Sequence, residues 1–304
     1  MILLILYNHI MLPLKLYDWI DKTKLNWDGL TENINAIELL KENQDKINWI
    51  FISSNKYAID LIKDNLDKID WNILNINPNA IEILMKYPRN IKWNCLSYNL
   101  NGIELLKKNQ DKINWRLLSL NANAIDLLKE NPDNIDWFYL SKNCNAIELL
   151  KRNQDKIHWP YLSSNPNAIE LLRENPDKID WDRLCLNPNA IKLLKEYPDK
   201  IDWSKLSGNN NAIELLKENQ DKIYWPDISA NAAAIELLKE NQDKINWYMF
   251  SSNPAIFTYD YEKMRNSNLE LKEEIIAKAL HPKRIFRLIE EYGEEEIYNI
   301  YLDD

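Results

Sequence analysis

Tryptophan recurs every 22 residues along most of this 304-residue chain, and the interval never changes. A constant interval without insertions is typical of a solenoid, in which each unit stacks on the next and cannot bury a core alone. Only Trp19 stands outside the series, which consists of Trp27, Trp49, Trp71, Trp93, Trp115, Trp137, Trp159, Trp181, Trp203, Trp225 and Trp247.

Several other columns of the repeat hardly vary when the tryptophan is counted as position 1. Position 7 is always Asn, from Asn33 to Asn253, and position 11 is Ile in every full copy. Position 21 is also Ile, and position 10 is Ala except at Gly102. Invariant columns of this kind are expected to form the frame of the stack.

The apolar residues within one repeat follow a helical period. In the copy between Trp159 and Trp181, Ala168, Ile169, Leu171 and Leu172 recur at steps of three and four. Asn165-Pro166 is typical of a helix N-cap followed by proline at the first helical position. We therefore expect a helix of about ten residues, followed by a shorter helical segment that Asp177 would cap.

These patterns predict an all-α fold, an α-solenoid of about 11 stacked 22-residue repeats. Each repeat would hold one α-helix and one short helical turn, of the α or 3₁₀ type, and the stack would form a right-handed superhelix. At about 9 Å per unit, it would extend on the order of 100 Å. A leucine-rich-repeat horseshoe is disfavoured, because the residue two before the position-4 leucine is often polar rather than part of a strand alternation.

The two ends differ from the repeats. We predict an N-terminal cap at 1–26, the solenoid at 27–252 and a helical C-terminal cap at 253–304. The first 12 residues are apolar but shorter than the roughly 20 that a membrane span needs, and they lack the basic start of a secretory signal. We expect them to cover the first repeat as a strand or helix. The stretches 269–280 and 283–302 have an amphipathic helical pattern.

No motif for catalysis, cofactor or metal binding is found, and we predict no enzyme, cofactor or metal site. The three histidines are far apart, and a serine repeated in most units is better explained by local backbone hydrogen bonds than as a nucleophile. The net charge of −9 disfavours a nucleic-acid partner. Three widely spaced cysteines indicate an intracellular, reducing compartment.

The invariant columns have two interpretations. The asparagines could form a polar binding strip, but capping and the linking of neighbouring coils explain them better. We therefore predict structural roles for Trp49, Trp71, Trp93, Trp115, Trp137, Trp159, Trp181, Trp203 and Trp225, and for Asn77, Asn99, Asn121, Asn143, Asn165 and Asn187.

The variable positions 2, 3 and 6 flank the tryptophan and often become apolar or aromatic in the middle of the chain. An exposed apolar run there would mark a binding site for another protein. The alternative is that these side chains fill the core between units. The candidate partner-binding residues are Ile73, Tyr98, Leu117, Leu120, Phe138, Tyr139, Tyr161 and Leu186.

The W-x-x-L-S-x-N-P-x-A-I-x-L-L columns resemble the tandem repeat proteins of amoeba-infecting giant DNA viruses, the mimivirus relatives. The flanks LPLKLYDWIDKTKLNW (12–27) and NPAIFTYDYEKM (253–264) also look like that family. The resemblance covers essentially the whole chain. It implies a viral protein of the host cytoplasm or the virion, and no particular activity. The repeat unit is also similar in architecture to leucine-rich variant repeats.

Three hypotheses for function follow. The first is a non-enzymatic scaffold that binds another protein, of host or virus, along the variable ridge. The second is a structural component of a virion or viral factory that associates with itself through its ends or edge. The third, disfavoured by the charge, is a reader of single-stranded RNA with one base per repeat.

Overall fold

The computed structural model describes residues 13–267, 281, 284–285, 287–288 and 290. The apolar start at 1–12, the whole of 269–280 and most of 283–302 lie outside these residues. The chain divides into two compact units, Tyr17–Phe257 and Met1–Leu16 with Thr258–Asp304. Two short strands, β1 (Leu14–Leu16) and β2 (Phe257–Tyr259), form a two-stranded sheet. The limits of the predicted caps stay predictions.

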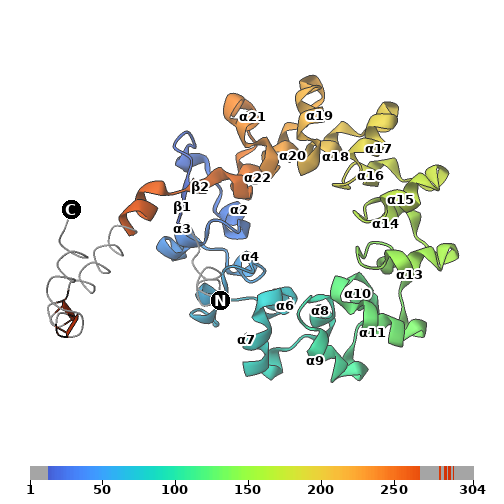
Figure 1. Cartoon of the computed structure of the whole chain (residues 1–304), viewed down its shortest axis with the longest axis horizontal. Helices are drawn as coiled ribbons and strands as arrows, with labels where there is room; N and C mark the ends of the chain where they lie inside the picture. The colour runs from blue at the N-terminus through green and yellow to red at the C-terminus, as the bar shows by residue number, and fades with distance from the viewer. Residues whose placement is uncertain (1–12, 268–280, 282–283, 286, 289, 291–304) are drawn as a thin grey trace. The chain divides into compact units, whose positions relative to one another are not determined.

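The unit Tyr17–Phe257 consists of short helices in a repeating order (Figure 1). Helices that begin at the repeat tryptophan lie along its inner side: α2 (Trp27–Glu32), α4 (Trp49–Ile52), α6 (Trp71–Ile76), α8 (Trp93–Tyr98), α10 (Trp115–Leu120), α12 (Trp137–Leu140), α14 (Trp159–Ser163), α16 (Trp181–Leu184), α18 (Trp203–Ser207), α20 (Trp225–Ser229) and α22 (Trp247–Ser251).

A second set begins at the position-11 isoleucine and lies on the outer side: α3 (Ile37–Glu42), α5 (Ile59–Lys63), α7 (Ile81–Lys86), α9 (Ile103–Lys107), α11 (Ile125–Glu130), α13 (Ile147–Lys151), α15 (Ile169–Arg173), α17 (Ile191–Glu196), α19 (Ile213–Lys217) and α21 (Ile235–Glu240).

Turns of 3₁₀ helix lie between the two sets: Gln44–Lys46, Pro78–Ala80, Pro88–Asn90, Gln110–Lys112, Ala122–Ala124, Pro132–Asn134, Gln154–Lys156, Pro176–Lys178, Pro198–Lys200, Asn210–Ala212, Gln220–Lys222, Ala232–Ala234 and Gln242–Lys244. Two further 3₁₀ turns, Lys22–Lys24 and Pro254–Ile256, precede α2 and follow α22.

The predicted all-α solenoid of stacked 22-residue repeats is confirmed, and the repeat is divided more finely than expected. The outer helix α15 has five residues rather than about ten, because the segment after Asn165 first makes a tight turn. The expected cap at Asp177 is wrong. Asp177 lies inside a 3₁₀ turn, and Asp180 caps α16 by accepting a hydrogen bond from the Arg183 backbone N–H.

The core is made of thin layers, one per repeat. The position-4 and position-14 aliphatic side chains, such as Leu162 and Leu172, are fully buried, and so are the position-10 alanines such as Ala168. Small side chains at position 10 let adjacent backbones approach closely. The tryptophans are half-buried at the side of this core rather than inside it.

The last repeat packs on the first, so that the unit Tyr17–Phe257 closes into a ring (Figure 1). Asn33 in α2's C-cap donates hydrogen bonds from Nδ2 to the carbonyl oxygens of Ser251, at 3.0 Å, and Asn253, at 2.8 Å. Asn165, inside the stack, makes the same pair of bonds to Ser141 and Asn143. The seam between α22 and α2 therefore repeats the internal contacts.

Residues at the N-terminal side of the seam complete the eleventh repeat. Lys24 lies over the Trp247 ring at 5.2 Å, as Lys46 lies over Trp27 at 4.6 Å. The seam is also tight at Gly29, where an added Cβ would lie 2.8 Å from the Ser251 Cβ and 2.9 Å from a backbone oxygen. The position-3 residue is larger in every other repeat, so glycine permits this close approach.

Closure follows from unequal packing on the two sides of each repeat. The inner helices pack directly on their neighbours, whereas the outer helices spread apart (Figure 1). Each repeat is thereby rotated relative to the last, and eleven repeats need about 33° per step to complete a circle. The stack predicted to extend on the order of 100 Å is instead the circumference of a ring.

Candidate binding surface

The serines at position 5, which recur in most repeats, form hydrogen bonds with the backbone. Ser163 Oγ donates to the Trp159 carbonyl at 2.9 Å and accepts from the Asp180 backbone N–H at 3.0 Å. It thus connects the start of its own inner helix with the residue that caps the next one. Where cysteine replaces serine, at Cys185, burial raises the pKa of the thiol. The column has a structural use in each repeat.

The invariant asparagines form a continuous ladder between repeats. Besides donating two hydrogen bonds to the preceding repeat, Asn165 accepts one at Oδ1 from the Asn167 backbone N–H at 3.0 Å. These asparagines are buried, with Asn165 at 0% exposure. No buried side-chain nitrogen or oxygen in the described part of the chain lacks a hydrogen-bond partner. The ladder therefore presents no polar group to a ligand.

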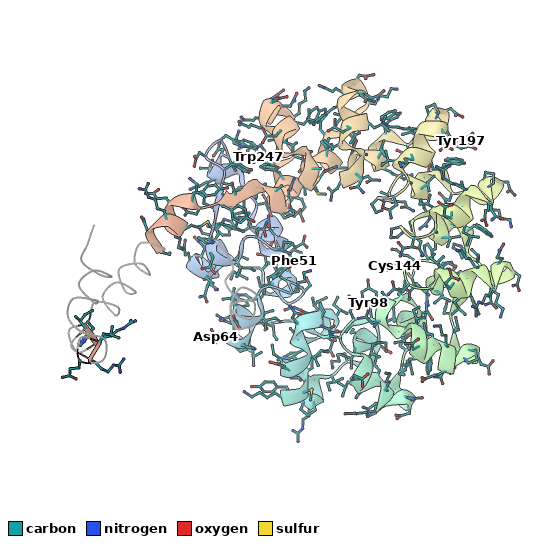
Figure 2. The ribbon with its side chains drawn as sticks, viewed as in Figure 1. Phe51, Asp64, Tyr98, Cys144, Tyr197 and Trp247 are labelled. Atoms are coloured by element: carbon teal, nitrogen blue, oxygen red, sulfur yellow. The ribbon has the colours of Figure 1, made fainter. Side chains whose placement is uncertain are left out.

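The variable positions lie along the inner edge of the ring. Figure 2 shows Phe51 at position 3, Tyr98 at position 6 and Cys144 at position 8 on this edge, whereas Tyr197 lies on the outside. Because the repeat is constant, residues at the same positions in other repeats occupy equivalent places. We call the side chains at positions 2, 3, 6 and 8 the inner edge.

The structure places all eight predicted partner-binding residues on or directly after the inner helices. Tyr98, Phe138 and Leu186 are 46%, 42% and 52% exposed, respectively. The other five are half-buried against neighbouring repeats: Ile73, Leu117, Leu120, Tyr139 and Tyr161. These positions therefore fill part of the contact between neighbouring repeats and also present part of their surface, and their role in partner binding stays a prediction.

Three of the eight residues meet in one cluster. The Phe138 ring lies 4.5 Å from the Tyr161 ring and 5.2 Å from the Tyr139 ring, between centroids, in edge-on arrangements. His158, which the sequence pattern places at a replaceable surface position, belongs to this cluster at 4.3 Å from Phe138. We call Phe138, Tyr139, His158 and Tyr161 the aromatic cluster.

Two arginines border the aromatic cluster, and sequence reasoning missed both. The Arg116 guanidinium lies 4.6 Å from the centre of the Tyr139 ring and donates to the Tyr139 hydroxyl. The Arg183 guanidinium lies 4.7 Å from the centre of the Tyr161 ring. Arg116 occupies position 2 of its repeat and Arg183 position 3. Because these are the variable positions next to the tryptophan, their place in the repeat could have identified them.

The surroundings of His158 disfavour its charged form. Burial lowers the pKa of the imidazole, and the nearby Arg183 lowers it further, whereas Asp180 opposes the shift. The neutral ring accepts a hydrogen bond at Nδ1 from the Tyr161 backbone N–H at 3.3 Å and so caps α14. The cluster is therefore adapted to an uncharged histidine.

Next to the aromatic cluster the inner edge becomes charged. Lys205 Nζ lies 2.7 Å from Asp182 Oδ2 and 2.9 Å from Asp202 Oδ2. Hydrogen bonds from the Ser204 hydroxyl and from Lys205 lower the pKa of Asp202 to about 2, and bonds to both carboxylates raise the pKa of Lys205. Lys205 is thus paired with two carboxylates, so this part of the edge is charged, whereas the adjacent aromatic cluster is its apolar part.

Within the residues that the structure describes, no group of three or more His, Cys, Asp and Glu side chains could hold a metal ion. The same part of the chain contains no helix long and apolar enough to cross a membrane. Comparisons of the chain with models of protein families, with curated proteins and with solved structures gave no match.

Proposed function

We propose that this protein is a non-enzymatic repeat scaffold that binds another protein along the inner edge of its ring. The observation that carries the proposal is the aromatic cluster with the two arginines that lie over its tyrosine rings. Tyrosine and arginine are among the residues enriched where protein interfaces concentrate their binding energy. The asparagine and serine columns are used in internal hydrogen bonds, and the alanine column is buried in the core. The inner edge, by contrast, differs from repeat to repeat.

Self-association is the second hypothesis, and the closed seam bears on it. Head-to-tail assembly through the ends would need α2 and α22 to separate, because each now covers the other. Such assembly therefore competes with closure within one chain, where the two ends are at high effective concentration. The viral origin and the location in a host cell or virion remain proposals that rest on the sequence resemblance.

Affinity capture from lysate of amoebal cells, read by mass spectrometry, tests the scaffold proposal. The comparison is between the wild-type protein, a Phe138→Ser variant and a triple variant with Phe138→Ser, Tyr139→Ser and Tyr161→Ser. Met85→Ser is the matched control, because Met85 is 64% exposed on the outer helix α7. We expect a captured protein that the Phe138 variants lose and the Met85 variant keeps. Equal capture by all four proteins contradicts the proposal.

A further inference from the structure

We propose that the inner edge from α6 to α14 binds a peptide segment in which acidic side chains alternate with apolar ones. This inference rests on the proposed function and names the chemistry of the partner. The apolar side chains of this arc include Ile73, Tyr98, Leu117, Phe138, Tyr139 and Tyr161. We call this stretch, together with the adjoining Arg183, the aromatic arc.

At positions 2, 3, 6 and 8 the five repeats of the aromatic arc carry only positive charges, Arg116 and Lys142, and no Asp or Glu. In the next repeat Arg183 follows Asp182, whose carboxylate is paired with Lys205. The whole chain has a net charge of −9, so this is a local reversal. A surface of apolar side chains with interspersed cations is complementary to an apolar segment with interspersed carboxylates.

Two of these cations have no acidic partner within the described part of the chain. Arg116 donates to the Tyr139 hydroxyl and forms no ion pair with a described residue, and neither does Lys142. The third cation, Arg183, has its Nε 3.7 Å from Oδ2 of Asp180, three residues earlier in the chain. By contrast, Lys205 outside the arc is held between two carboxylates. The arc therefore has unused capacity to bind negative charge.

Two carboxylates at the start of the arc's inner helices accept hydrogen bonds from the backbone. Asp70 accepts hydrogen bonds from the Asn72 and Ile73 backbone N–H groups, and Asp136 accepts one from the Tyr139 N–H. Both cap inner helices, where the helix dipole already stabilises their charge. Among the described residues, neither carboxylate forms an ion pair with Arg116 or Lys142.

The two arginines retain donors for recognition. A guanidinium has five N–H donors, and Arg116 uses only one of its nitrogens on the Tyr139 hydroxyl, so other N–H groups remain for a carboxylate. Carboxylates also form charge-assisted, often bidentate bonds with this group. Arg116 and Arg183 lie three repeats apart, at most about 27 Å at 9 Å per repeat. About 8 extended residues or about 18 helical ones cover that length.

Fluorescence anisotropy with defined peptides tests this inference. The probe is a fluorescein-labelled peptide of about 20 residues, with glutamate at every third or fourth position among leucine and tyrosine. A second peptide has lysine in place of each glutamate, and a labelled single-stranded RNA of similar length is the third probe. We expect the acidic peptide to bind more tightly than either, with an affinity that falls as salt is added.

Charge-reversed variants connect the binding to the arc. Arg116→Glu combined with Arg183→Glu should weaken the acidic peptide at least about tenfold. Arg152→Glu is the control, because Arg152 is exposed at the end of the outer helix α13. Four results would each overturn the inference. The lysine peptide could bind as tightly as the acidic one, the RNA could bind more tightly, the double variant could keep its affinity, or the acidic peptide could fail to bind. If one of these results is found while Phe138→Ser still abolishes capture of a protein from the lysate, the proposed function stands and only the acidic chemistry of the partner is wrong.

Discussion

At the scale of the residue, the molecule depends on polar side chains that are buried and fully paired. Each repeat buries one asparagine amide that joins its own turn to two carbonyl groups of the preceding repeat. Burial of an amide is costly unless all of its hydrogen bonds are made. An invariant asparagine is explained by this geometry, since no shorter or charged side chain both donates twice and accepts once.

Replacing one ladder asparagine should be costly. In Asn165→Ala, the Ser141 and Asn143 carbonyl groups each lose one accepted hydrogen bond, and the Asn167 N–H loses its acceptor. We expect a loss of about 3 kcal/mol in the free energy of unfolding. The control is Asn167→Ala, which removes one exposed hydrogen bond at a position where another repeat has Ala233. Its expected effect is within about 0.5 kcal/mol. Urea unfolding followed by circular dichroism measures both. Similar midpoints for the two variants would contradict the assigned role.

A second residue-scale prediction concerns the half-buried tryptophans. Lys178 lies over the Trp159 ring at 4.5 Å, and Lys156 lies over Trp137 at 4.6 Å. Asn134 occupies the equivalent position beside Trp115. Asn134→Lys should therefore add one cation–π contact and stabilise the fold by about 0.5–1 kcal/mol. Thermal unfolding measures the gain, and Lys178→Asn should show a loss of similar size. If Asn134→Lys raised the melting temperature but Lys178→Asn did not lower it, the cation–π contact would not be the cause of the gain.

At the scale of the element, the helices are too short to be stable alone. Helices of four to six residues, such as α12 and α14, are far below the length at which isolated helices form. Their caps and their neighbours hold them. A change at a cap therefore affects a whole repeat, and the aromatic cluster includes such a cap, His158.

The histidine cap predicts a dependence of stability on pH. Because folding lowers the pKa of His158 below its usual 6.5, the unfolded chain binds this proton more readily. The stabilisation is complete above pH 6.5 and decreases as the pH falls through that value toward the lower folded pKa. His158→Asn keeps a cap of the kind seen at Asn114 and removes this titration. The melting temperature of the wild-type protein should fall more between pH 7.5 and 5 than that of the variant. Parallel curves would exclude this contribution.

At the scale of the whole molecule, the decisive feature is that Tyr17–Phe257 has no free repeat end. An open solenoid exposes the hydrophobic face of its first and last repeats and needs capping units. Here the two faces cover each other through contacts of the same type as those inside the stack. The ring also places the side chains at positions 2, 3, 6 and 8 of successive repeats along a common inner edge.

Closure predicts that the first ladder residue is as important as an internal one. Asn33 has no preceding repeat in the sequence, so in an open solenoid Asn33→Ala would cost little. In the ring it donates to Ser251 and Asn253, and we expect a loss comparable to that of Asn165→Ala, about 3 kcal/mol. Urea unfolding of both variants in parallel provides the comparison, with small-angle scattering to detect opening. A negligible effect at Asn33 would indicate an open stack in solution.

The sequence by itself determined the period, the helical class and the invariant columns, because these depend on residues close together in the chain. The tryptophan interval and the asparagine caps can be derived without coordinates. Only the tertiary structure decided the closure, because a small rotation per repeat, summed eleven times, determines whether a stack extends or returns to its start. It also decided that Arg116, Phe138 and Arg183 share one surface, since that requires neighbouring repeats to place their variable side chains along the same edge.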